Sequence, residues 1–572
     1  MIAVFRDADD AVAETNHEQD VTNWAVFTPD DDAAVSVAND GRVRVMRPGQ
    51  HTVVVRFLQH VVAARVLMPF ALEATREGER AEGKEDRRSA GASGSRGIDR
   101  EVSELLATLR IPVSPPADDA TLLRRVTLDL TGRLPSEAEV RAYLADASPE
   151  KYAAGRSVAW PKAFTNHWTY QLAGWLRLRA PGGDTLAADA MHRWLRQQIA
   201  ADVGLDEIAR RLLTAMGDTH SVGPAVFHRL AGDPREAADW PAKRCWGFDC
   251  DVQCHDHPLD RWTQDDYHGL AALFARIERG RIVRRLDRGD VIHPVTQQPA
   301  LPRTPGGEPL DAEAAGPEPL ADWIVAADNP YFAKTQVNRV WQAMMGRGLI
   351  EPVDDVRDTN PPTHPRLLDS LAEDFRRDGY RLRPTIRAIA LSATYRRSSR
   401  PHHGNGFDER FYSHALERPM TAEIYLDALC DVTGVREVFD PQANDVRAVQ
   451  LASPNVASTA LDILGRCSRE QSCESGSSNG GGMAAQLHLL NGELLNRRLL
   501  DEQGWLHTQL DRDLPGVVEA TYLRCFGREP ADRERAFWVN ELAGADGRRP
   551  SPEKLADFFW SILVSREFAT NH

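Results

Sequence analysis

The chain has 572 residues, 42% of them hydrophobic, and this length predicts several domains rather than one hydrophobic core. A formal net charge of −15 excludes a broad basic face, so we expect no nucleic-acid partner. No apolar run approaches the roughly 20 residues of a membrane span, which predicts no transmembrane segment. The N-terminal sequence MIAVFRDADDAV has neither the basic start nor the apolar core of a signal peptide.

Residues 1–70 have the pattern of a small all-β domain. Short runs rich in β-branched residues follow one another, and polar turns such as Asn39-Asp40-Gly41 separate several of them. The predicted strands lie at residues 2–5, 24–27, 34–37, 42–46, 52–57 and 61–67. This spacing is typical of a β-sandwich.

The remainder divides by composition. Residues 71–97 are dominated by Arg, Glu, Gly, Ser and Lys, which predicts a disordered linker. Residues 98–280 and 318–572 show helical periodicity, and a Pro/Gly-rich connector at 281–317 lies between them. The predicted fold class is therefore multidomain, with a small all-β sandwich followed by two mainly α-helical domains. Because apolar helices border the connector on both sides, we expect the two helical domains to share an interface.

Three helix starts can be predicted from capping residues. Ser136 with Glu139, and Thr263 with Asp266, form the pattern of a capping box. Ser551-Pro552 combines a cap with a first-turn proline. The helix that starts after Thr263 is expected to continue to Gly280.

The most informative segment of the chain is Cys250-Asp-Val-Gln-Cys254-His255-Asp256-His257-Pro258. Thiolates and imidazoles are strong ligands for metals, and a haem c site uses two thiols for thioether bonds and a following His as axial ligand. Three interpretations follow from these residues. Cys250, Cys254 and His255 bind haem c; or Cys250, Cys254, His255 and His257 bind zinc or iron; or the cluster is structural and holds no cofactor.

The haem interpretation makes further demands on the surroundings. An apolar slot is expected beside the two thiols, with Trp246, Phe248 or Trp262 as its walls. The usual haem c spacing is C-x-x-C-H, whereas three residues separate the thiols in this chain.

The other cysteines have simpler interpretations. Cys430 and Cys525 lie in apolar helical patterns and are expected to be inert core residues. Cys467 and Cys473 are close enough in sequence to form a disulfide, and Cys245 is a candidate third thiol for the cluster.

Several further polar residues favour structural roles. We expect His364 to lie in a rigid turn whose side chains cap the next helix. We expect Arg339, next to Asn338, to form an internal ion pair with Asp354 or Asp355. His488 and Asn491 are expected to be satisfied core polar groups. Arg466 and Glu474 are candidates for a pocket rim beside the Gly/Ser-rich run.

Long motifs in both helical regions resemble paired modules of planctomycete proteins. Those of the first region, TLLRRVTLDLTG at 121–132 and CHDHPLDRWTQDDY at 254–267, resemble the planctomycete cytochrome-C-like family of unknown function. Those of the second region, VNRVW at 337–341, GRGLIEPVDD at 346–355, NPPTHP at 360–365, SATYR at 392–396 and LHLLNG at 487–492, resemble the module of unknown function that follows it. Residues 1–70 resemble a bacterial Ig-like module of the second group.

This resemblance implies an exported protein, so we expect an extracytoplasmic location, periplasmic or at the cell surface, and a chain that lacks its natural N-terminus. The family pattern at the cluster is C-A-x-C-H-D-H-P, from which this chain departs by one additional residue. The implied function is that of a cytochrome-like or scaffold protein in electron transfer or cell-surface assembly. Its expected partner is a protein or polysaccharide at the cell surface. The alternative is a metal-dependent or redox enzyme that acts on an extracellular polymer such as polysaccharide, so whether the protein is an enzyme stays open.

Overall fold

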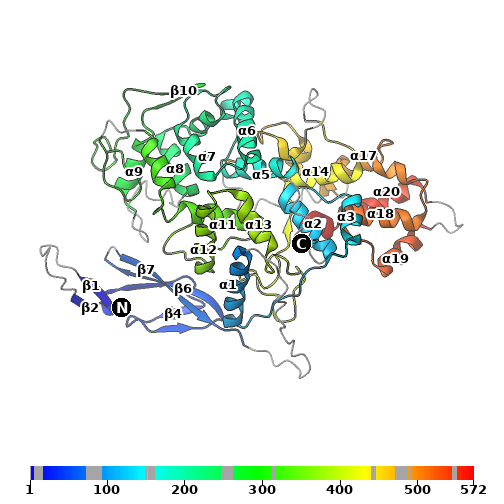
Figure 1. Cartoon of the computed structure of the whole chain (residues 1–572), viewed down its shortest axis with the longest axis horizontal. Helices are drawn as coiled ribbons and strands as arrows, with labels where there is room; N and C mark the ends of the chain where they lie inside the picture. The colour runs from blue at the N-terminus through cyan, green and yellow to red at the C-terminus, as the bar shows by residue number, and fades with distance from the viewer. Residues whose placement is uncertain are drawn as a thin grey trace.

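The structure is a computed structural model that describes most of the chain. The described residues are 2–5, 17–58, 60–71, 93–148, 151, 162–245, 262–311, 316–439, 446–470, 487–489, 492–543 and 550–572. A small N-terminal β-sheet region is followed by mainly helical regions, which confirms the predicted fold class. Figure 1 shows the N-terminal strands at the lower left of the molecule and the last helices at the right. None of the described helices combines the length and the apolar character needed to cross a bilayer.

The β region consists of a three-stranded sheet and two hairpins. The antiparallel sheet has the order β3-β6-β7, with strands β3 (Val26–Pro29), β6 (Gly49–Phe57) and β7 (His60–Met68). The hairpins are β4 (Val35–Val37) with β5 (Val43–Val45), and β1 (Ile2–Phe5) with β2 (His17–Asp20). The β4–β5 hairpin packs on the sheet through buried Ala34, Val35 and Val53. All the predicted strands are present, whereas β2 was not predicted; the Ig-like assignment itself stays a prediction.

The first helical region contains eight described α-helices and a small sheet. These helices are α1 (Ser93–Leu109), α2 (Asp119–Thr131), α3 (Glu137–Ala145), α5 (Lys162–Trp175), α6 (Thr185–Ala200), α7 (Leu205–Thr214), α8 (Pro234–Cys245) and α9 (Gln264–Ala272). The sheet has the order β8-β10-β9, with strands β8 (Gly217–Asp218), β10 (Ile282–Arg285) and β9 (Ile277–Arg279). The 3-10 segments at Pro181–Gly183 and Gly223–Arg229 complete it.

The second helical region continues to the end of the chain. Its described helices are α10 (Glu318–Val325), α11 (Phe332–Met345), α12 (Pro365–Arg377), α13 (Leu382–Leu391), α14 (Ala422–Thr433), α15 (Thr459–Ile463), α17 (Glu493–Leu499), α18 (Leu514–Phe526), α19 (Asp532–Leu542), α20 (Pro552–Leu563) and α21 (Arg566–Ala569). A two-residue pair joins β11 (Arg418–Pro419) to β12 (Thr570–Asn571).

The predicted helix starts are confirmed, and one predicted helix end is wrong. Both capping boxes form, at Ser136–Glu139 and Thr263–Asp266, and Ser551 caps α20. However, α9 ends at Ala272 rather than at Gly280, and Ile277 belongs to strand β9. The helical spacing of apolar residues continues past Ala272 because Phe274 and Ile277 are buried in the same core without being helical.

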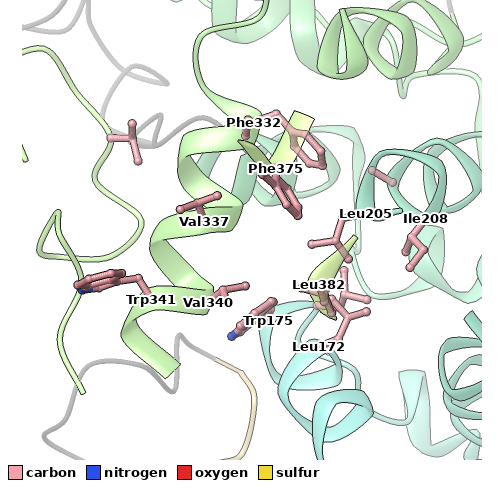
Figure 2. Close-up of a cluster of buried hydrophobic side chains, with 14 of the residues drawn as sticks. Leu172, Trp175, Leu205, Ile208, Phe332, Val337, Val340, Trp341, Phe375 and Leu382 are labelled. Carbon is pink, nitrogen blue, oxygen red and sulfur yellow. The ribbon is translucent and has the colours of Figure 1, made fainter. Parts of the chain in front are cut away.

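The two helical regions share one large hydrophobic core. Helix α1 packs on α12 and α13, while α7 packs on α10 and α8 on α11. Figure 2 shows Val337 and Val340 of α11 in the same buried cluster as Trp175 of α5 and Leu205 of α7. The predicted interface between the two helical regions is therefore confirmed.

The β region is docked on this helical body. Phe70 donates its backbone N–H to Leu109 O at 2.9 Å, and its ring lies 4.4 Å from that of Phe407. Arg65 Nη1 donates to Thr363 O at 3.2 Å. Helix α1 begins at Ser93, within the range predicted as a linker, and packs in the core beside Phe70. Phe70 and helix α1 thus belong to the same packed body.

Helix α2 clamps the C-terminal segment through buried charged side chains. Arg124 donates to the carbonyl oxygens of Cys525, Glu567, Phe568 and Thr570 at 2.9–3.2 Å. Burial lowers the pKa of Arg124 to about 10. Since these acceptors lie more than 400 positions along the chain from Arg124, this contact joins the beginning of the first helical region to the end of the second.

Replacing Arg124 with Ala should lower the free energy of unfolding by at least about 3 kcal/mol, because four buried carbonyl groups lose a charged donor. Urea unfolding followed by circular dichroism measures this loss. The matched control is Arg141→Ala, since Arg141 forms exposed ion pairs with Glu137 and Glu519 and should contribute less than about 1 kcal/mol. Equal losses for both variants would contradict the clamp.

Candidate functional site

The predicted cofactor residues lie outside the described part of the chain. Residues 246–261 contain Cys250, Cys254, His255 and His257, as well as the proposed slot walls Trp246 and Phe248. The haem, metal and structural interpretations of the cluster therefore all stay predictions. The structure does describe the two helices that flank this segment and the side chains around their ends.

The flanking helices are fastened to each other. Helices α8 and α9 pack together, and the Tyr267 hydroxyl of α9 donates to Asp239 Oδ1 of α8 at 3.0 Å. The entry to α9 is fixed by its capping box, in which Thr263 Oγ1 donates to Asp266 Oδ2 at 2.9 Å. Trp262 is buried, and its ring lies 6.1 Å from that of Tyr331 in the shared core; its predicted role as a slot wall stays a prediction. The two described helices on either side of residues 246–261 therefore belong to one packed unit.

Two buried histidines lie on the α9 side of this arrangement. The ring centres of His268 and His293 are 4.9 Å apart in a T-shaped contact. His293 Nδ1 accepts from the backbone N–H groups of Val295 and Thr296, which leaves the proton on Nε2. That Nε2 lies 3.2 Å from Asp265 Oδ1, close enough for a charge interaction, but the geometry does not form a hydrogen bond. Among the described side chains, no group of three or more His, Cys, Asp or Glu residues is arranged to hold a metal ion.

A cavity of about 230 Å³ opens beside α8. Its lining combines three carboxylates, two guanidinium groups and an apolar floor. These residues are Leu176, Arg177, Arg179, Phe227, Leu230, Ala231, Glu236, Ala237, Asp239 and Glu470. Asp239 lies in the helix that leads into residues 246–261, and Glu470 directly precedes residues 471–486, which contain Cys473. The cavity thus lies where both cysteine-bearing segments leave the described body.

The thiols outside the cluster have distinct environments. Cys525 is fully buried and Cys430 half-buried, both are free, and burial raises the pKa of each thiol. Their predicted inert character is consistent with this protonated state. Cys467 is disulfide-bonded. The predicted partner Cys473 lies outside the described residues, as does the side chain of Cys245, so neither assignment is tested.

The structural interpretation of Asn338 and Arg339 is confirmed. Arg339 is buried and forms an ion pair with Asp354. Asn338 Nδ2 donates to the carbonyl oxygens of Ile350 and Val353, and its Oδ1 accepts from Ile350 N. Together these contacts close the loop that follows α11.

His364 is buried at the start of α12, as expected for a rigid turn, but the prediction that side chains of this turn cap the helix is wrong for His364. Its Nδ1 contacts Thr363 Oγ1 at 3.0 Å instead, and Pro365 occupies the first helical position.

The predicted rim around the Gly/Ser-rich run is only partly described. Arg466 forms an ion pair with Asp462, one helical turn earlier, at 2.8 Å. His488 is half-buried, whereas Glu474 and Asn491 lie outside the described residues. Sequence reasoning did not identify the residues that line the cavity, since they come from four separate segments and share no motif.

Buried imidazoles should make the protein sensitive to acid. Burial lowers the pKa of His364 and His167 to about 3, and that of His192 and His228 to about 4. In the unfolded chain the pKa is near 6.5, so below pH 6.5 the unfolded state binds more protons and stability falls as the pH drops toward 4. Urea unfolding at pH 7 and pH 5 should show that each of these buried imidazoles lowers the free energy of unfolding by about 2 kcal/mol at pH 5.

The test variant for this pH dependence is His364→Asn, which should lose less stability than the wild type between pH 7 and pH 5. Exposed His402→Gln is the control and should leave the loss unchanged. The same pH dependence in wild type and His364→Asn would refute the assignment of His364.

Two family models match the helical part of the chain. Residues 97–279 match PSCyt2, a protein of unknown function (DUF1549), and residues 318–542 match PSD1, a protein of unknown function (DUF1553). Neither match extends into the β region. No curated protein and no solved structure matches the chain. The two matches, in this order, confirm the predicted pairing of the helical modules.

Proposed function

We propose that this chain, in which a PSCyt2 module is followed by a PSD1 module, is an extracytoplasmic cytochrome-like protein in electron transfer or cell-surface assembly. Cys250 and Cys254 would attach haem c through thioether bonds, and His255 would be its axial ligand. A bound haem supplies a one-electron redox couple. The observation that carries the proposal is that a segment with two thiols and two imidazoles leaves and re-enters the body between two helices joined by Tyr267 and Asp239.

The described residues around the segment are compatible with a cofactor there. The Tyr267–Asp239 hydrogen bond and the capping box of α9 hold together the two described helices that flank residues 246–261. His268 of α9 and His293 are two further buried imidazoles in contact with each other. The proposed partner is a protein or polysaccharide at the cell surface, with the docked β region as part of the contact surface.

Expression of the full chain with a haem-maturation system tests the proposal. The wild type should show a Soret band and a pyridine haemochrome spectrum, and Cys254→Ser should lose the double thioether signature. Cys430→Ser is the matched control, because Cys430 is a free thiol of the second helical region and should keep the spectrum.

Protein without haem would refute the haem assignment, and metal analysis of the same samples then decides between the remaining interpretations. Stoichiometric zinc or iron that is lost in Cys254→Ser would assign a metal centre to Cys250, Cys254, His255 and His257. The absence of both haem and metal would leave a structural cluster.

One observation favours the alternative function, a metal-dependent or redox enzyme that acts on an extracellular polymer such as polysaccharide. The cavity beside α8 brings the carboxylates Glu236, Asp239 and Glu470 together over an apolar floor. Glu236 and Asp239 belong to α8, the helix that precedes the cysteine-containing residues 246–261. Carboxylates and guanidinium groups bind sugar hydroxyls, and an apolar floor accommodates the face of a sugar ring.

If the alternative holds, Glu236→Gln and Glu470→Gln should each lower the release of reducing ends from a polysaccharide mixture by at least about 10-fold. Exposed Glu502→Gln should leave the release unchanged. An inactive wild type, or equal activity in all variants, would contradict it.

A further inference from the structure

A second, smaller cavity lies between the two helical regions. It has a volume of about 90 Å³, enough for several water molecules or a small organic molecule. Its walls come from the C-terminal half of α5, the N-terminus of α14 and the segment 465–469. Four of its residues carry polar groups that could contact a ligand: Tyr170, Thr421, Glu423 and Arg469.

Arg469 presents a buried positive charge to this cavity. Arg469 is only 5% exposed, and this burial lowers its pKa. Nη1 donates to the carbonyl oxygens of Leu178 and Ala452 at 3.0 and 3.3 Å. Within the described part of the chain, Nε and Nη2 of Arg469 have no hydrogen-bond acceptor, and no carboxylate forms an ion pair with it. A buried cation is costly unless an anion or further acceptors compensate it.

Glu423 presents a buried acceptor to the same cavity. Glu423 is 6% exposed, and its Oε2 accepts a hydrogen bond from the Tyr170 hydroxyl at 2.9 Å. No described donor reaches Oε1. Tyr170 also carries the guanidinium of Arg469 over its ring, 5.6 Å from the centroid. The cation and the carboxylate therefore flank one aromatic ring without forming an ion pair with each other.

The N-terminus of α14 adds donors to the cavity. Thr421 is the N-cap residue, but its side chain makes no capping hydrogen bond. The first-turn N–H groups of a helix have no intrahelical acceptor and favour a negative charge. Arg469 and this helix end thus favour an anionic group, whereas Glu423 favours a hydrogen-bond donor.

We propose that this cavity binds a small carboxylate with a hydroxyl or ammonium group on the adjacent carbon, an α-hydroxy or α-amino acid. The carboxylate faces Arg469 and the N-terminus of α14, and the donor faces Glu423 Oε1. Such a ligand bridges the two charges that the protein itself leaves unbridged. The site is separate from the proposed cofactor segment and does not depend on it.

Isothermal titration calorimetry on the full chain tests this proposal with glycolate and glycine, which also distinguishes the two ligand classes. Acetate lacks the donor and ethylene glycol lacks the carboxylate. We expect glycolate or glycine to bind at least about 10-fold more tightly than acetate, because a hydrogen bond to a charged group contributes a factor of this size. Ethylene glycol should not bind.

Two variants separate the roles of the charges. Glu423→Gln should reduce the preference for glycolate or glycine over acetate to about threefold or less. Arg469→Lys should weaken the binding of every carboxylate, since Lys lacks the planar fork of donors. Exposed Glu493→Gln, at the start of α17, is the matched control and should bind like the wild type. Near-UV circular dichroism verifies that each variant is folded.

Three results would overturn the proposal. These are no saturable binding of glycolate or glycine, equal binding of acetate, or binding that both Glu423→Gln and Arg469→Lys leave unchanged. The first result would identify the cavity as a hydrated gap in which water bridges Arg469 and Glu423.

Discussion

The arrangement of the helical body depends on charged side chains that α2 buries against distant backbone. Arg124 reaches the carbonyl groups at the end of the chain, and Arg125 donates to those of Tyr395 and Arg397. Asp129 accepts from the Tyr395 hydroxyl and from Asn571, and burial raises its pKa. A buried guanidinium is tolerated only where acceptors surround it, so these contacts specify one position for the C-terminal segment. The motif TLLRRVTLDLTG is therefore structural in this chain.

The same helix explains why the two sequence modules do not correspond to two structural cores. One core extends from Ile98 to Ala452 and so includes both modules. The second core combines Leu128 and Leu134, from the first module, with residues of α14, α18 and α20. Each module would expose apolar surface without the other, so the pair behaves as one folding unit. The cavity beside α8 and the cavity at Arg469 both lie where segments of the two modules meet.

Local signals in the sequence predicted local structure well. Thr263 with Asp266 identified the start of α9, and the β-branched runs identified the strands, because caps and alternation act over a few residues. Arg339 was predicted to pair with Asp354 or Asp355 of the next loop, and the structure pairs it with Asp354. The end of α9 was predicted wrongly, because Ile277 of strand β9 continues the apolar spacing of the helix after the helix has ended at Ala272. Arg469 and Glu423 could not be predicted as neighbours, because only tertiary contacts bring Glu423 of α14 and Arg469 of the segment 465–469 to the same Tyr170 of α5.

The docking of Phe70 on α1 has a mechanical consequence. Phe70 is bound to Leu109, and α1 belongs to the same core, so residues 72–92 join two points of one rigid body. A force applied to the β region is carried into the helical body by β7, by the tilted Phe70–Phe407 ring contact and by the Arg65 hydrogen bond. Under small loads the β region therefore moves together with the helical body, because these described contacts resist its displacement.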